Sequence, residues 1–144
     1  MIYTEQTKKA LKLCFAAHKE QVDKSGMPYV FHPFHLAEQM KDEVTCTVAL
    51  LHDVVEDTDY TLEDLRAMGF EAAVIDALAL LTHDPKEPYM DYVARIKENP
   101  VAKAVKLADL KHNSDRTRLA PHEVNEWVIA REKKYRAAMR LLKK

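Results

Sequence analysis

Apolar side chains recur at spacings of three and four along nearly the whole chain, and this periodicity predicts helices. The first helix covers about residues 4–21 and ends in a loop, residues 23–29, that contains both Gly and Pro. A second helix opens at His32-Pro33, because proline suits a first helical turn. Residues 44–56 are apolar on most sides, so we expect this third helix to lie at the centre of the fold.

Residues that begin or end helices punctuate the second half of the chain. Thr61 is a good N-cap, Gly69 a good stop, and residues 70–81 form another apolar helix. Proline predicts the start of three more helices, at Pro88, Pro100 and Pro121. No repeat, linker or low-complexity segment interrupts them. The pattern predicts a single all-α domain over residues 1–144.

Composition narrows the class of protein. The chain has 144 residues, 47% of them apolar and 31% charged, which is typical of one globular domain. With 22 basic and 23 acidic side chains, nothing indicates a nucleic-acid partner. No signal peptide and no apolar run of roughly 20 residues is present, so we expect a cytoplasmic protein without a membrane span. Cys14 and Cys46 are isolated in apolar contexts and predict buried free thiols.

Only two glycines occur, Gly26 and Gly69. Glycine-rich loops that bind phosphate, as in P-loop and Rossmann folds, are therefore absent. Few glycines also favour a helical protein over a sheet protein with many tight turns.

Four ligand-type side chains interrupt an apolar run at residues 50–58, LLHDVVEDT. On one continuous helix, His52 and Glu56 would share a face, and so would Asp53 and Asp57. Burying carboxylates beside leucine and valine is costly unless a cation compensates their charge. A divalent metal centre with a general base beside it accounts for this pattern, and predicts a metal-dependent hydrolase.

The motifs resemble the H…HD…D pattern of the HD-domain phosphohydrolase superfamily, and more closely the hydrolase domain of RelA/SpoT proteins. In size the chain is similar to the stand-alone small alarmone hydrolases, the Mesh1-like group. The similarity extends over roughly residues 5–140. It rests on residues 17–21 (AHKEQ), 25–29 (SGMPY), 32–33 (HP), 49–58 (ALLHDVVEDT) and 106–109 (KLAD), with Asn113.

The resemblance implies roles for particular residues. One divalent ion, usually manganese, would be held by His32, His52, Asp53 and Asp109. An acidic pair would position and deprotonate the attacking water, namely Glu56 and Asp57. Three positions would contact the nucleotide, namely Lys24, Ser25 and Asn113. The implied reaction removes the 3′-pyrophosphate of guanosine tetra- or pentaphosphate, the alarmones of the stringent response, without any synthetase activity.

The residues themselves leave plainer interpretations open. His52-Asp53 could be a helix-borne ion pair, and Glu56-Asp57 a helix end. Lys106 could approach phosphates or lie along the surface. The other histidines are expected to have no role, although His112 adjoins the site, and Trp127 is expected to be a core anchor.

Two departures from the family pattern leave the substrate open. Asp23 stands where the family loop has an arginine that stacks on guanine, and Arg116 stands where a small hydroxyl residue is usual. An acid cannot stack as a guanidinium does. The alternatives are another phosphorylated nucleotide, as for a nucleotidase or an NADPH 2′-phosphatase, or a metal-bearing module that only senses nucleotides. A water-activating acidic pair speaks against the sensor, and oligomeric state stays open.

Overall fold

Helices carry the whole fold in the computed structural model, which describes residues 1–144 and contains no strand beyond an isolated bridge between Val22 and Pro28. The all-α prediction is therefore confirmed. The elements are α1 (Glu5–His18), α2 (Phe31–Glu38), α3 (Glu43–Leu51), α4 (Val54–Asp57), α5 (Leu62–Ala67), α6 (Ala72–Leu81), α7 (Tyr89–Lys97), α8 (Pro100–Asn113), the 3₁₀ turns η1 (Arg116–Arg118) and η2 (Pro121–Glu123), and α9 (Glu126–Lys143).

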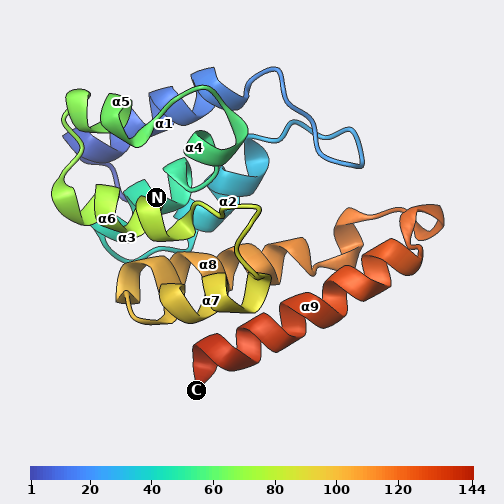
Figure 1. The fold of residues 1–144 in the computed structure, drawn as a ribbon. Coiled ribbons are helices and arrows are strands. Elements are labelled where there is room, and N and C mark those ends of the chain that lie inside the picture. The colour runs from blue at the N-terminus through green and yellow to red at the C-terminus, as the bar shows by residue number, and fades with distance from the viewer.

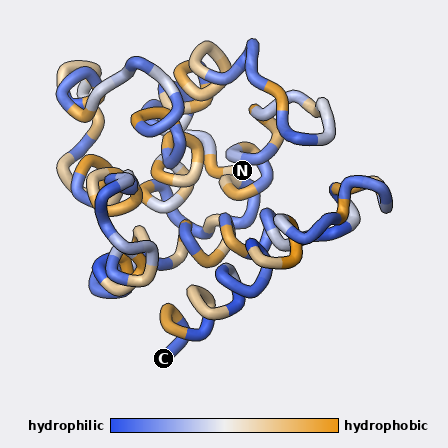
Figure 2. Tube along the Cα trace, turned by 45° about the vertical axis from the view of Figure 1, so that its right-hand side comes forward, coloured by the Kyte–Doolittle hydropathy of each residue, from blue (hydrophilic) through white to orange (hydrophobic).

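The central position expected for the third helix is confirmed. Every residue of α3 from Thr45 to Leu51 is buried, and α3 packs against α1, α2, α6 and α8. Asp42 begins the helix as its N-cap by accepting a hydrogen bond from the Thr45 amide, at 2.8 Å. Figure 2 shows hydrophilic stretches on the outer connections, with hydrophobic stretches where helices face one another. No helix is long and apolar enough to span a bilayer.

Two connections far apart in sequence lie on the same side of the molecule (Figure 1). One is the segment between α1 and α2, residues 19–30, and the other joins α8 to α9, residues 114–125. The Ser25 hydroxyl ties them together, because it donates to the Arg118 carbonyl and to the Glu123 carboxylate at 3.0 Å. Gly26, with φ +79°, allows the tight turn in the first connection.

The predicted helix over residues 44–56 is wrong in one respect, because it breaks at His52-Asp53. The Nδ1–H of His52 donates to the Ala49 carbonyl at 2.6 Å. In an uninterrupted helix that carbonyl would accept from the Asp53 amide. Asp53 takes φ −107° and ψ 0°, and its own carbonyl then starts α4 by accepting from the Asp57 amide. His52 and Glu56 therefore do not share one face of a continuous helix.

Two other boundaries differ from prediction. The first helix ends at His18 rather than near residue 21. The last begins at Glu126 rather than Pro121, because Asn125 caps it by accepting from the Val128 amide at 3.0 Å. Pro121 instead opens η2. Trp127, expected in the core, lies in the first turn of this shorter helix and is 53% exposed, so that expectation is wrong.

Candidate active site

Three buried side chains from three elements converge on one point. His32 of α2, His52 at the end of α3 and Asp109 of α8 each offer a ligand atom, and these atoms all lie within 4.8 Å of one another. Asp109 Oδ1 is 2.9 Å from His32 Nε2 and 3.6 Å from His52 Nε2. Two imidazoles and a carboxylate are a mixed nitrogen and oxygen donor set that suits a divalent transition ion.

The environment of His52 fits a cation. Its Nδ1–H is committed to the Ala49 carbonyl, which leaves Nε2 as the atom that points into the cluster. This buried Nε2 has no hydrogen-bond partner, although carboxylate oxygens of Asp53 and Asp109 lie 3.0 and 3.6 Å away. Burial alone would lower the pKa of His52, but these two carboxylates raise it well above its usual value. A positive charge is therefore favoured here, and the donor set fits a bound metal ion.

Asp53, the fourth predicted ligand, lies beside the three-residue cluster. Its Oδ2 is 3.0 Å from His52 Nε2 and accepts a hydrogen bond from the hydroxyl of Tyr29. Burial alone would raise the pKa of Asp53, but the charge and hydrogen bond of His52, with the hydrogen bond from Tyr29, lower it overall. The side chain is thus a carboxylate oriented at the edge of the cluster, and ligation by Asp53 stays a prediction.

Lys106 fixes the orientation of Asp109. Its Nζ lies 2.9 Å from Asp109 Oδ2, and only 13% of its side chain is exposed. Asn113, one turn later, donates to Asp109 Oδ1 at 3.0 Å. Burial alone would raise the pKa of Asp109, but Lys106 and the two imidazoles hold it well below its usual range. Lys106 is therefore neither a surface lysine nor, in this structure, a side chain directed at a phosphate.

His112, for which no role was expected, belongs to the site. Its Nδ1 lies 2.7 Å from His32 Nδ1 with the two ring planes 6° apart, and its ring also stacks on that of His35, with centroids 4.1 Å apart. For His32 to offer Nε2 to a metal, His32 Nδ1 must carry the proton and His112 Nδ1 must accept it. The three-residue spacing from Asp109 on one helix indicated this proximity.

The predicted acidic pair lies on α4, which directly follows Asp53 in the chain. Glu56 and Asp57 are both exposed and belong to the short α4. The backbone N–H of His83 donates to Glu56 Oε1 at 2.7 Å, which fixes the position of that carboxylate. Although much of the Asp57 side chain is exposed, partial burial of its carboxyl group, followed by the charges of Asp53 and Glu56, raises its pKa to about 6. Asp57 therefore has a basicity suited to a proton acceptor, and the same role for Glu56 stays a prediction.

The three predicted substrate contacts line one hollow of about 280 Å³. Lys24 Nζ lies over the ring of Trp127, 2.9 Å from its centroid. The Ser25 hydroxyl and the Asn113 side chain are engaged within the protein, with Glu123 and Asp109 as partners. Tyr29 lines the same hollow, which therefore adjoins the ligand cluster at both Tyr29 and Asn113.

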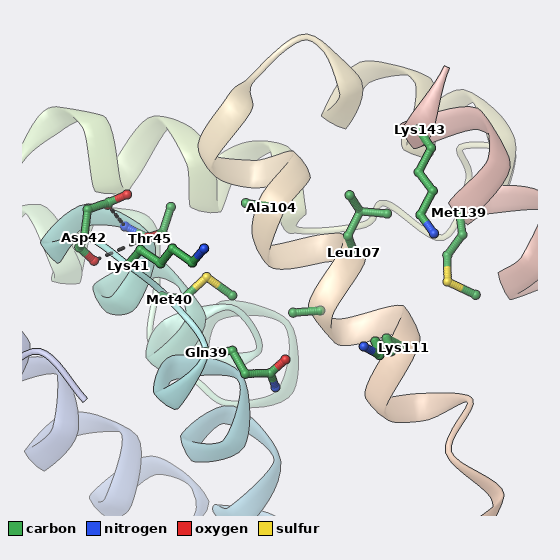
Figure 3. Close-up of a pocket in the computed structure, with 11 residues that line it drawn as sticks. Gln39, Met40, Lys41, Asp42, Thr45, Ala104, Leu107, Lys111, Met139 and Lys143 are labelled. Atoms are coloured by element: carbon green, nitrogen blue, oxygen red, sulfur yellow. Dashed lines mark hydrogen bonds between the residues drawn. The ribbon is translucent and has the colours of Figure 1, made fainter.

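A second hollow, of about 460 Å³, lies elsewhere, between the start of α3, α8 and the end of α9. In Figure 3, the lysine side chains of Lys41, Lys111 and Lys143 surround it, with Leu107 and Met139 among its apolar lining. None of the predicted ligands, acids or substrate contacts lines it. A third hollow, of about 550 Å³, is lined by His32 itself. The candidate active site is therefore the region beside the cluster, where this hollow and the one of about 280 Å³ share Tyr29, Asp23 and Arg118.

The unusual Arg116 lies outside that hollow. Its Nε and Nη2 donate to both carboxylate oxygens of Glu132, at 2.9 and 2.8 Å, and tie η1 to α9. This departure from the family pattern is explained by packing between elements.

Comparison with known proteins identifies relatives of this arrangement. No family model matches the chain. The chain is 36% identical to the guanosine-3′,5′-bis(diphosphate) 3′-pyrophosphohydrolase MESH1 of Mus musculus over 134 residues, which cover 78% of this chain and 74% of that protein. It is 33% identical to a GTP pyrophosphokinase of Streptomyces coelicolor, over 84% of this chain.

Coverage differs among these relatives. The chain spans only 16% of the length of the Streptomyces protein and 16% of a probable GTP pyrophosphokinase of Mycobacterium leprae. Among solved structures it is similar to a metazoan ortholog of SpoT that hydrolyzes ppGpp, with a TM-score of 0.73 and 26% identity. That similarity covers 99% of this chain and 85% of the other.

Proposed function

The chain belongs to the MESH1 family of guanosine-3′,5′-bis(diphosphate) 3′-pyrophosphohydrolases, and we propose that it hydrolyses ppGpp and pppGpp, releasing pyrophosphate from the 3′ position. One observation carries the proposal. A buried His32, His52 and Asp109 cluster adjoins a hollow that gathers basic side chains. Residues 1–144 would act as a single phosphohydrolase domain.

The metal would be held by His32, His52 and Asp109, with Asp53 as the fourth ligand, and manganese is the proposed ion. When bound, it supplies Lewis-acid stabilisation of charge on the phosphoryl oxygens. The residues around it set the donor geometry. Lys106 holds Asp109 Oδ2, so that Oδ1 faces the two imidazoles. His112 would hold the tautomer of His32 by accepting a hydrogen bond from its Nδ1–H.

Glu56 would orient the attacking water and accept its proton. The His83 amide holds Oε1 of Glu56, which leaves Oε2 to accept the proton. Asp57, with its pKa raised to about 6, is the second acceptor at the same edge. Such proton transfer typically contributes about 10²- to 10⁴-fold to the rate.

The nucleotide would lie in the hollow of about 280 Å³, which Lys24, Arg118 and Arg131 make cationic despite Asp23 and Asp115. Lys24, at the mouth of the hollow beside Trp127, would meet the phosphate charge. Ser25 and Asn113 would contact the substrate, while they also hold the walls through Glu123 and Asp109.

The test is release of pyrophosphate from ppGpp by protein stripped with chelator and then supplied with Mn²⁺, Mg²⁺ or Zn²⁺. We expect pyrophosphate and GDP, with turnover only after a divalent ion is added. NADPH and nucleoside monophosphates serve as competing substrates. Orthophosphate from one of these, with ppGpp inert, would retain the hydrolytic chemistry and reject the proposed substrate.

A further inference from the structure

We propose that Arg118 contacts the nucleoside part of the substrate and that Asp23 positions it there; this rests on the proposed function. Arg118 Nη2 lies 3.6 Å from Asp23 Oδ2, across the same hollow that Lys24, Ser25 and Asn113 line. The two side chains come from the two connections that meet on one side of the fold, residues 19–30 and 114–125.

Asp23 is well suited to a positioning role. Its Oδ1 accepts the backbone amides of Ser25 and Met27, at 2.9 and 3.0 Å, and so closes the turn that contains Gly26. Only Oδ2 remains to face Arg118. Because one oxygen is committed to the loop and the other to a cation, this carboxylate does not oppose a phosphorylated ligand as an unpaired acid would.

Arg118 is fixed at both ends. Its backbone carbonyl accepts from the Ser25 hydroxyl at 3.0 Å. Its Nη1 donates to the His112 carbonyl at 2.9 Å and to Asn113 Oδ1 at 3.2 Å. The guanidinium is therefore held with a defined plane, and 24% of the side chain is exposed. Its Nε–H has no protein acceptor and can donate to a ligand.

The location of this guanidinium indicates which part of a nucleotide it meets. Tyr29 and Asn113, at the inner wall, hydrogen-bond the carboxylates of Asp53 and Asp109. A substrate with its 3′-pyrophosphate at the cluster would extend its nucleoside away from that wall, toward the two connections. A fixed guanidinium there offers a flat face on which a purine can stack. Arg118 thus supplies, from the opposite connection, the kind of group that Asp23 does not.

The experiment compares the wild-type protein with Arg118→Gln, first with ppGpp and then with the two products as ligands. We expect Arg118→Gln to raise KM for ppGpp about tenfold, as for loss of one charged hydrogen bond, with kcat changed less than about twofold. In calorimetry with Mn²⁺, the Kd for GDP should rise by a similar factor, while the Kd for pyrophosphate stays the same. Lys111→Gln removes an equal charge from α8 outside the hollow, and is the control.

Two variants at Asp23 distinguish a direct contact between Arg118 and the substrate from an effect of the net charge of the hollow. Asp23→Asn keeps the oxygen that closes the turn and should raise KM less than Arg118→Gln does. Asp23→Arg alone would set two guanidinium groups against each other and should not improve KM. Added to Arg118→Gln, the same Asp23→Arg change should recover most of the lost affinity for GDP.

Wild-type KM in Arg118→Gln, or equal weakening of GDP and pyrophosphate, would overturn the inference. Failure of the wild-type protein to hydrolyse ppGpp would reject the proposed function instead. GDP binding by the wild-type and Arg118→Gln proteins would still decide whether this side chain contacts a guanine nucleotide.

Discussion

Lys106 and Asp109 form a buried ion pair, with Nζ 2.9 Å from Oδ2, one turn apart on α8. Burial alone would lower the pKa of Lys106, but the charge and hydrogen bond of Asp109 raise it well above its usual value. Both groups therefore stay charged within the structure, and each depends on the other.

Replacement of Lys106 by methionine should leave Asp109 as a buried charge without its cation. We expect the free energy of unfolding of the chelator-treated protein to fall by about 3 kcal/mol. Added Mn²⁺ should recover part of this loss, because a cation then compensates Asp109. Urea unfolding with and without Mn²⁺ measures both effects. Lys103→Met, at a half-buried lysine of the same helix that forms no ion pair, should change stability little.

His112 should control metal affinity without touching the metal. His112→Phe removes the acceptor for the Nδ1 proton of His32, and we expect Mn²⁺ to bind about 10- to 100-fold more weakly. His112→Asn can present an amide oxygen near the same position and should retain more of the affinity. Calorimetric titration of the stripped proteins distinguishes them. Equal Kd values for His112→Phe and the wild type would reject this role.

Glu56 should act on turnover and not on metal content. Glu56→Gln preserves an oxygen for the His83 amide but cannot accept a proton. We expect kcat with ppGpp to fall by about 10² or more, with Mn²⁺ bound as tightly as in the wild type. Single-turnover assays and metal analysis test this. Full turnover in the variant would transfer the proton-acceptor role to Asp57.

The raised pKa of Asp57 makes the stability of the metal-free protein depend on pH. This pKa rises from 3.8 to about 6 on folding, so the folded state binds the proton more tightly and the protein loses stability as pH rises from about 4 to 6. Asp57→Asn should therefore stabilise the chelated protein at pH 8, and not at pH 4. Because this side chain is exposed, we expect only about 1 kcal/mol, or roughly 3 °C in Tm. Thermal unfolding at both pH values checks the sign.

Most helices could be predicted because their boundaries depend on local chemistry. Thr61 does cap α5, and Gly69 does follow its end with φ +88°. Pro100 begins α8 behind the Asn99 cap. The break at His52 could not be predicted, since it depends on a histidine side chain competing for the Ala49 carbonyl. The apolar periodicity continues through His52 and so gives no indication that the helix breaks there.

The site, like the helices, has contacts that could be predicted from the sequence and contacts that could not. The family resemblance implied that His32, His52 and Asp109 lie together, and the structure brings those three together. Lys106 and His112 each lie three residues from Asp109 on α8, so helical spacing could have indicated that both lie beside it. The bond from Tyr29 to Asp53 joins residues 24 positions apart, and the Arg118 contact to Asp23 joins segments at opposite ends of the chain. Only the folded arrangement brings these residues together.

The hydrogen bond from His52 to Ala49 limits how the donor set can evolve. The same imidazole ends α3 with one nitrogen and presents the other to the cluster. Aspartate at position 52 would offer the metal a ligand but could not donate to the Ala49 carbonyl. Helix α3 could then continue past this position and move residue 53 away from the cluster. Single substitutions can therefore alter the connections around Asp23 and Arg118 far more readily than they can replace His52 in the cluster.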